Sequence, residues 1–230
     1  MVGTVFNAVT VAIGASAGLV LGKRLSEGLH AIIFQALGLF TLGIGVAMSL
    51  AVANLFAVFL SLIAGVVAGH ALQLDQRMKA ATARLGEGTG TALVQAVLLF
   101  CMGAMTLIGC MQDGLNGDAT VLFIKGSMDL VSSAFLAAAL GRGVLLAAPA
   151  LLLIQGGLTA AFALWGAAWS DVLIADLTGL GGLLLLALGL DLLKVRSFAL
   201  LNFVPAFAFV PLFQPMAQWL ETGLPQLLLP

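Results

Sequence analysis

The chain has 230 residues, of which 62% are hydrophobic and 8% are charged, and its formal net charge is -1. Soluble domains typically carry about 25% charged residues, so this composition excludes an ordinary soluble globular protein and indicates an integral membrane protein. The near-zero net charge gives no sign of a nucleic-acid partner. The chain is uncharged between Glu87 and Asp113 and again between Arg142 and Asp171. Each of these stretches exceeds the roughly 20 residues that a membrane-spanning helix needs.

Apolar stretches separated by short connections predict an all-α, polytopic membrane protein with seven or eight transmembrane helices in one domain, residues 1–213. Lys23 and Arg24 follow the first stretch and no basic residue precedes it, which is typical of a membrane helix rather than a signal peptide. The last stretch contains Pro205 and Pro211, and we expect it to be tilted, broken or re-entrant. The predicted spans cover residues 3–22, 31–50, 54–72, 91–111, 122–140, 143–167, 174–193 and 198–213.

The longest polar segment covers residues 73–90. Apolar residues recur within it at helical spacing, from Leu74 to Leu85. This pattern predicts a short amphipathic helix on the cytoplasmic membrane surface, and a solvated connector is the alternative. Residues 214–230 are expected to form a C-terminal tail.

Basic residues lie in alternate connections between the predicted spans, and the other connections are uncharged or acidic. By the positive-inside rule, the basic connections are cytoplasmic and both termini lie outside. Trp165, Trp169 and Trp219 then fall at the outer interface, where aromatic side chains gather. Lys125 departs from the pattern. The basic connections contain Lys23, Arg24, Arg77, Lys79, Arg84, Arg142, Lys194 and Arg196, and the acidic ones contain Asp113, Asp118, Asp171 and Asp176.

A weak internal repeat relates the two ends of the chain. A shift of 144 residues lays Leu42 on Leu186 and Gly45 on Gly189, and it matches the first three predicted spans with the last three. The matched spans cross the membrane in opposite directions. Inverted repeats of this kind build many transporters, with a site near the membrane centre between the copies. Chance similarity between helices rich in Gly and Leu is the alternative.

Small residues recur at every fourth position on the first and third predicted spans. This spacing lets two helix backbones approach closely, which matters in lipid because the hydrophobic effect does not drive helices together there. The facing helix belongs either to the same chain, as tight packing, or to a second copy, as a homodimer face. The residues concerned are Gly14, Gly18 and Gly22, and Ser61, Gly65 and Gly69.

The fifth predicted span contains two ionisable side chains, which are costly inside a membrane and are a functional hypothesis by default. Lys125 and Asp129 are four residues apart, so they share one helix face and can form an ion pair. We interpret Asp129 as the ligand of a cation or proton, with Lys125 as its gate or counter-ion. A helix-end ion pair with no transport is the alternative.

Other polar residues extend this predicted pathway. Asp113 and Asp118 flank Gly114 and Gly117 between two spans, where they would form an acidic outer funnel or else a solvated loop. Asp191 lies near the inner end of the seventh span, where it would line the path or pair locally with Lys194. Three uncharged residues within spans would line the path or only cross-link helices. They are Asn7, Gln155 and Asn202.

The sequence has no metalloprotease helix motif, no nucleophile elbow and no phosphate-binding loop. We therefore expect no enzyme activity, no cofactor and no metal site. The leading hypothesis is a small transporter or channel for an ion or small solute, and the acidic outer connections favour a cation or proton. The alternative is a non-transporting scaffold or accessory subunit that binds partner helices through its glycine faces.

Several short motifs resemble those of one bacterial family. The most specific are Gly3-Thr4 with Asn7, and Gln112-Asp113-Gly114-Leu115 with Gly117-Asp118. The others are Leu21-Gly22-Lys23-Arg24-Leu25, Gln35-Ala36-Leu37-Gly38, Gly103-Ala104-Met105, Lys125 with Asp129, Gln155-Gly156, and Asn202 with Pro205-Ala206. From about residue 2 to residue 212 the chain resembles the domain-of-unknown-function 554 family, the uncharacterised YqgA/YdfK-type membrane proteins. The resemblance implies a multi-pass protein of the bacterial cytoplasmic (inner) membrane, and it implies no activity.

Overall fold

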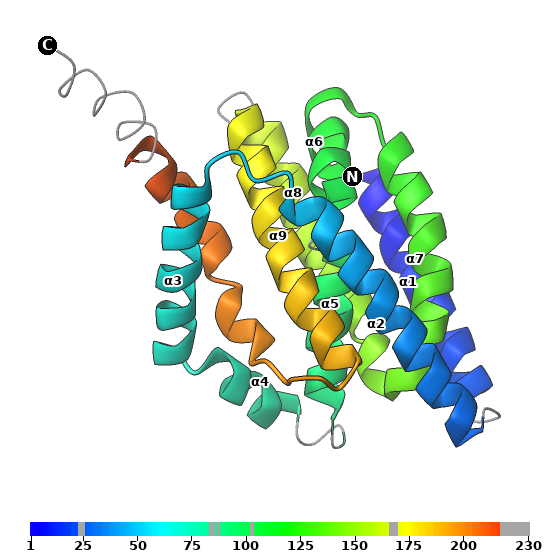
Figure 1. Cartoon of the computed structure of the whole chain (residues 1–230). Helices are drawn as coiled ribbons and strands as arrows, with labels where there is room; N and C mark the ends of the chain where they lie inside the picture. The colour runs from blue at the N-terminus through cyan, green and yellow to red at the C-terminus, as the bar shows by residue number, and fades with distance from the viewer. Residues whose placement is uncertain (23–25, 83–85, 87, 102–103, 166–169, 217–230) are drawn as a thin grey trace, which may run out of the picture.

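A computed structural model shows that the protein is all-α in its described part (Figure 1), which comprises residues 1–22, 26–82, 86, 88–101, 104–165 and 170–216. Three helices begin at residues that cap helix ends. The side chains of Ser26, Asn54 and Ser170 accept hydrogen bonds from backbone N–H groups three residues on, at 3.3, 2.8 and 3.1 Å. The helices are α1 (Val2–Gly22), α2 (Glu27–Ser49), α3 (Leu55–Ala71), α4 (Leu74–Thr82), α5 (Thr89–Cys101), α6 (Ala104–Asn116), α7 (Thr120–Leu140), α8 (Ala147–Trp165) and α9 (Asp171–Leu192), with short 3-10 helices η2 (Gly141–Val144) and η4 (Leu200–Phe203) and a last helix over 206–216.

Five helices in the described residues are long and apolar enough to cross a membrane, and the number rises to seven if each of two bent helix pairs forms one span. The bends are 48° between α3 and α4 and 61° between α5 and α6. The predicted span 91–111 is therefore interrupted, and the Thr106 hydroxyl donates to the Phe100 carbonyl at 3.0 Å across the break. The last predicted span, 198–213, largely overlaps the apolar helical segment Leu200–Met216, which comprises η4 and the last helix and is too short to count among the candidate spans.

Two predicted surface segments have different outcomes. The helix α4 lies within the predicted connector 73–90, and its Lys79 and Asp75 form an ion pair at 2.7 Å. The predicted tail 214–230 begins inside the last helix, which continues to residue 216. The rest of that tail lies outside the described residues.

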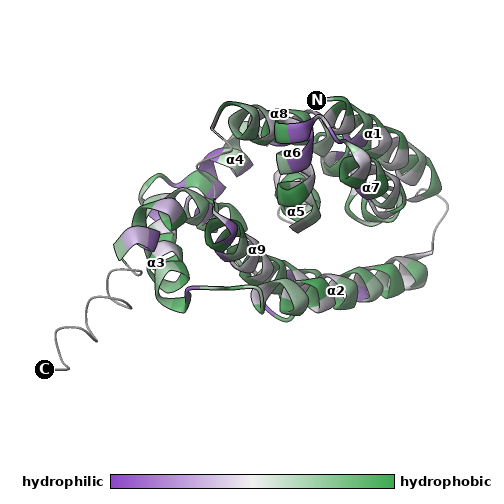
Figure 2. Cartoon of the chain, turned by 90° about the horizontal axis from the view of Figure 1, so that it is seen from above, coloured by the Kyte–Doolittle hydropathy of each residue, from purple (hydrophilic) through white to green (hydrophobic). Residues whose placement is uncertain are grey.

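The helix α9 is the most buried of the candidate spans. In its most apolar window 67% of the residues are buried, against 24% to 44% in the other four. Viewed from above, α2 lies along α9, while α1, α7, α6 and α8 gather on the other side of α5 (Figure 2). The chain therefore has two tightly packed helix pairs, α1 with α7 and α2 with α9.

The glycine faces predicted from the sequence lie against helices of the same chain. A Cβ atom added at Gly14 or Gly18 would overlap the backbone of α7, and Gly22 approaches Ala138 of the same helix. Gly65 and Gly69 meet the backbone of residues 202–206 in the same way. Close backbone approach of this kind replaces side-chain burial as the source of packing contacts between helices in lipid.

Candidate functional site

The buried ion pair predicted on the fifth span lies on α7. Lys125 and Asp129 are 5% and 8% exposed, and the Lys125 ammonium donates to Asp129 Oδ2. Their spacing of four residues places them one above the other on the helix. An isolated charge at this depth would be strongly unfavourable, and the pairing compensates both charges at once.

Two other predicted residues join this pair from neighbouring helices. Asn7 of α1 interacts with the Asp129 carboxylate, and its Nδ2 donates to Gln155 Oε1 of α8 at 3.2 Å. Both residues are fully buried. Asn7 Oδ1 and Gln155 Nε2 have no hydrogen-bond partner among the described residues. An unpaired buried polar atom costs about 1–3 kcal/mol, so this acceptor and this donor are the least favourable part of the cluster within the described residues.

Further polar contacts hold the cluster in place. The Thr4 and Thr159 hydroxyls lie 3.3 Å apart between α1 and α8, and Thr10 donates to the Asn7 carbonyl at 2.8 Å. The Cys110 thiol of α6 contacts the Gln155 carbonyl at 3.6 Å. A polar cluster thus connects α7, α1, α8 and α6 inside an otherwise apolar bundle. We call Lys125, Asp129, Asn7 and Gln155 the polar cluster.

A cavity of about 430 Å³ reaches the charged end of the polar cluster. Lys125, Asp129 and Ser132 of α7 line one wall, and Phe40 and Ile44 of α2 line the opposite wall. The walls between them come from α5, α6 and α9. The cavity therefore gives the buried ion pair a space, between α2 and α7, that another molecule or ion can enter.

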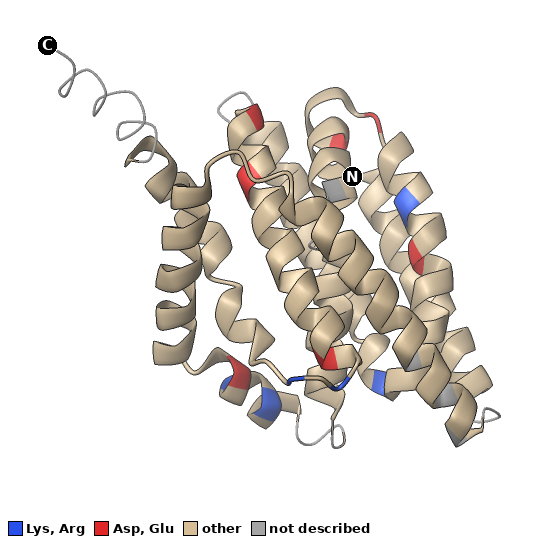
Figure 3. Cartoon of the chain, viewed as in Figure 1, with Lys and Arg blue, Asp and Glu red and all other residues tan. Residues whose placement is uncertain are grey.

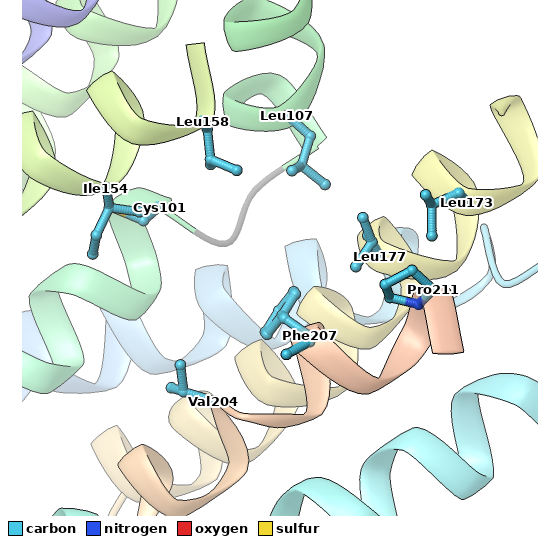
Figure 4. A pocket seen from close by; sticks show the side chains of 10 residues that line it. Cys101, Leu107, Ile154, Leu158, Leu173, Leu177, Val204, Phe207 and Pro211 are labelled. Carbon is cyan, nitrogen blue, oxygen red and sulfur yellow. The ribbon is translucent and has the colours of Figure 1, made fainter. Parts of the chain in front are cut away.

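A larger cavity, of about 530 Å³, lies on another side of the α5–α6 break. Its lining is almost entirely apolar and includes Leu158 of α8, Leu177 of α9 and Phe207 of the last helix (Figure 4). None of the residues that line it belongs to the polar cluster. We place the candidate site at the smaller cavity because chemistry that moves a charge needs the polar cluster, whereas the larger cavity offers only apolar contacts.

The predicted outer funnel is only partly formed. Asp113 lies inside α6 rather than in a loop, is 7% exposed, and pairs with the terminal ammonium of Met1 at 2.6 Å. The helix continues past Asp113 and ends before Gly117, which has a φ of 71°. Asp118 is exposed and accepts from the Thr120 N–H at 2.9 Å. The prediction that both carboxylates stand in one outer loop is therefore wrong for Asp113.

The remaining two predicted pathway residues lie at the other end of the bundle. Asp191, near the end of α9, accepts a hydrogen bond from Gln95 Nε2 of α5 at 2.6 Å. Asn202 Oδ1 accepts from the Asp75 N–H at 3.1 Å and so holds the start of α4. The structure brings four of the eight predicted pathway residues together, and Asp191 and Asn202 are not among them.

Comparisons with known proteins assign the chain to a family. Its sequence matches the family described as "Protein of unknown function (DUF554)" over residues 2–214. The chain belongs to the DUF554 family. It is 30% identical to "Uncharacterized protein YqgA" of Escherichia coli (strain K12) over 232 residues, which cover 95% of this chain and 99% of that protein.

A second DUF554 relative is the "Uncharacterized membrane protein YdfK" of Bacillus subtilis (strain 168). It is 31% identical over 220 residues, covering 92% of this chain and 94% of that protein. No solved structure matches the chain. The resemblance identified from short motifs is thus confirmed, and the DUF554 chain is a polytopic, all-α membrane protein with bacterial relatives.

Two polar residues important in the structure were missed by the sequence reasoning. Asp176, counted there as a loop charge, lies inside α9 with no exposed surface. It accepts from the backbone N–H groups of Ala53 and Asn54 at 2.9 and 2.8 Å, and from Gln214 Nε2 at 3.0 Å. Gln95, 6% exposed, is the partner of Asp191. Both residues stand within apolar stretches of the sequence. A polar residue in such a stretch is expected to need a buried hydrogen-bond partner, and this was the signal that could have identified them.

Proposed function

We propose that this DUF554 protein is a small transporter or channel for a cation, a proton-coupled ion or a small solute, with Asp129 as the main ligand. The observation that carries the proposal is a buried ion pair, Lys125 with Asp129, on the wall of a cavity of about 430 Å³ within the helix bundle. Ionisable residues within membrane spans are costly and commonly mark an ion pathway, which favours transport over a purely structural role.

The pair suits an exchange of cations. The Lys125 ammonium neutralises Asp129 while no other cation is present, which keeps the net charge of the site at zero. A cation or proton that reaches Asp129 through the cavity takes over this role and frees Lys125 to move toward the cavity. Asn7, whose side chain hydrogen-bonds the Asp129 carboxylate, holds that carboxylate in place for the exchange.

The charge distribution supports an orientation with both termini outside, in the cytoplasmic membrane of a bacterium. Apart from Lys125 on α7, the described Lys and Arg gather at the end of the molecule where α4 and the connection after α9 lie, and most Asp lie toward the other end (Figure 3). By the positive-inside rule the basic end faces the cytoplasm. Five residues of the original pattern, Lys23, Arg24, Arg84, Trp169 and Trp219, lie outside the described residues.

Two observations support an inverted repeat that relates α1, α2 and α3 to α8, α9 and the last helix. Shifted by 144 residues, α2 would run over 171–193, and α9 runs over Asp171–Leu192. The contacts between these two helices also repeat: Gly45 meets Leu186, and Gly189 meets Leu42. A two-fold rotation about an axis in the membrane plane that exchanges α2 with α9 would also exchange these two contacts. Inverted repeats in transporters are related by an axis of this kind.

The test is flux in proteoliposomes with a pH-sensitive dye and a panel of monovalent and divalent cations. We expect flux in the natural protein and none in Asp129→Asn. Because that variant leaves Lys125 without its carboxylate, the double variant Lys125→Gln/Asp129→Asn, which keeps the site neutral, is measured beside it. Asp171→Asn, an exposed change on α9, is the matched control and should retain flux. Equal flux in all four proteins would refute the role of Asp129.

The scaffold alternative loses the observation that motivated it. Gly14, Gly18, Gly65 and Gly69 are covered by helices of their own chain, so these faces are not open to a partner helix. The homodimer stays a prediction. It would need a different surface from the one that the glycine spacing indicated.

A further inference from the structure

The larger cavity, of about 530 Å³, lies between α8, α9, the last helix and the break between α5 and α6 (Figure 4). Every described residue that lines it has a hydrocarbon side chain except Cys101. Ligand pockets commonly have volumes of about 300–1,000 Å³, so this space is large enough for a ligand rather than a single solvent molecule. We call it the apolar cavity.

Water and ions are poor occupants of the apolar cavity. A buried water molecule makes about three hydrogen bonds, and cavities lined by apolar side chains stay dry. Among the described lining residues only Cys101 has a polar side-chain atom, and a thiol is a weak donor and a weak acceptor. An empty space is also unfavourable, because its walls lose the dispersion contacts of a packed interior. The chemistry of the walls therefore favours an apolar occupant.

The apolar cavity reaches the surface of the bundle beside the last helix, since Ala208 and Pro211 line it and are exposed. On the last helix, Leu212, which follows Pro211, is 67% exposed. On α8, Leu153, which precedes the lining residue Ile154, is 77% exposed. Apolar residues thus flank the opening on both helices, and exposed helix faces of this kind contact lipid tails in a membrane.

The depth of the opening indicates which part of the membrane it meets. Ile154 and Leu158, which line the cavity, lie in the middle of the candidate span Ala147–Leu164 of α8. The middle of a membrane-spanning helix lies within the hydrocarbon core, which is about 30 Å thick. At that level the molecules around the protein are lipid acyl chains, and the headgroups lie farther out.

We propose that the apolar cavity binds one acyl chain of a membrane phospholipid, which enters laterally between α8 and the last helix. Such a chain needs no hydrogen-bond partner and gains dispersion contacts with Leu158, Leu177 and Phe207. Cys101 of α5 and Leu107 of α6 also line the cavity, so the bound chain packs against both halves of the interrupted span. Phospholipid should therefore stabilise the bend between α5 and α6.

This inference does not depend on the proposed function. No described residue lines both the apolar cavity and the cavity at the polar cluster. A protein that binds an acyl chain here and shows no flux would keep this inference and lose the proposed function.

The experiment is photolabelling of the delipidated full chain in digitonin, a detergent without a flexible alkyl chain. The probe is a phosphatidylcholine with a diazirine group in the middle of one acyl chain, and mass spectrometry identifies the labelled residues. Labelling of Leu158 and Phe207 should saturate at a low fraction of probe, because one chain fills the cavity. Labelling of the exposed Leu153 and Leu212 should rise in proportion to the probe, as for lipid that merely surrounds the protein.

Two variants fill the cavity with a bulky ring, Leu158→Trp from α8 and Ala208→Trp from the last helix. Ala47→Trp is the matched control, because Ala47 is exposed on α2 and lines neither cavity. We expect both filling variants to lose most of the saturable labelling of Phe207 and the control to keep it. Added phospholipid should raise the unfolding temperature of the natural protein and the control more than that of the filling variants.

Three results would overturn the proposal. The first is labelling of Leu158 and Phe207 in the natural protein that only rises in proportion to the probe. The second is the same saturable labelling of Phe207 in all four proteins. The third is displacement of the probe by a free fatty acid at lower concentrations than by unlabelled phosphatidylcholine, since the occupant would then be a fatty acid.

Discussion

Asp129 and Asp176 are both buried aspartates inside helices, but their neighbours differ. Asp176 is fully buried and accepts three hydrogen bonds, all from protein donors on the α2–α3 connection and the last helix. Asp129 pairs with the single ammonium group of Lys125, and both residues line a cavity. The first arrangement fixes three segments of the chain to one another, and the second holds a charge with one partner at the wall of a cavity, as the proposed exchange of cations requires. Burial of an aspartate in a membrane helix therefore does not by itself indicate transport, and the proposed role of Asp129 rests on its lysine partner and its cavity.

The largest expected effect comes from breaking the pair of charges. Lys125→Met leaves the Asp129 carboxylate buried without a counter-ion and should lower the free energy of unfolding by about 3–5 kcal/mol. Lys125→Met/Asp129→Leu should recover most of this loss, because apolar residues replace a buried ion pair at little cost. Denaturant unfolding in detergent measures both. A single variant as stable as the natural protein would mean that water in the cavity already solvates Asp129.

Removal of the structural aspartate should have the next largest effect. Asp176→Leu removes the acceptor of three donors, two of which, the Asn54 N–H and Gln214 Nε2, belong to buried residues. Each buried donor that loses its acceptor costs about 1–3 kcal/mol, so we expect a loss of roughly 3 kcal/mol. Ion flux separates Asp176 from Asp129 more clearly than stability does. The fraction of Asp176→Leu that still folds should keep the ion flux of the natural protein. Loss of flux without loss of stability would place Asp176 in the pathway and remove the distinction between the two aspartates.

A smaller effect is expected from packing. Gly18→Leu forces a side chain against the backbone of Ala134 on α7, and overpacking of this kind costs about 1–3 kcal/mol. Gly43→Leu on α2 is the matched control, because a Cβ at Gly43 meets nothing within 4 Å. Unfolding measurements at two protein concentrations distinguish packing within one chain from packing between two copies of the chain. A loss for Gly18→Leu that is independent of concentration is expected from packing within one chain, and a concentration-dependent loss would instead indicate a dimer face.

The sequence predicts the helices well and the contacts between distant helices poorly. Predicted spans 54–72 and 122–140 agree closely with Leu55–Ala71 and Thr120–Leu140, because the length of an apolar stretch between polar connections sets a membrane helix. The Lys125–Asp129 pair follows from local spacing alone. The approach of Asn7 to Gln155 does not, since 148 residues separate them and only the packing of α1 on α8 joins them.

The break between α5 and α6 was also beyond the sequence reasoning. The surrounding stretch is apolar and contains no proline, so it has the pattern of one continuous span. Asp176 was missed for the opposite reason. Its charge led to its being counted with the connections, although the apolar residues on both sides of it belong to α9. For Asp176 the deciding factor is its hydrogen bonds to Ala53, Asn54 and Gln214, which lie far from it in the sequence.

The smallest expected effect concerns Asp118, an exposed aspartate that contrasts with both buried ones. Hydrogen bonds from the Thr120 side chain and backbone N–H hold the pKa of the Asp118 carboxyl below its usual value. A lowered pKa in the folded state means that this stabilisation is complete above the unfolded pKa of about 3.9 and is lost as the pH falls through the folded value.

Carbon-13 NMR titration of the Asp118 carboxyl measures the shift of its pKa directly. Thr120→Val should move the pKa of Asp118 part of the way back, because it removes the hydroxyl and keeps the N–H. An unchanged pKa in that variant would assign the shift to the backbone alone. The role of Asp118 in transport is tested separately by the flux of Asp118→Asn. Unchanged flux is expected if Asp118 only orders the start of α7, and reduced flux would support its predicted place in the outer funnel.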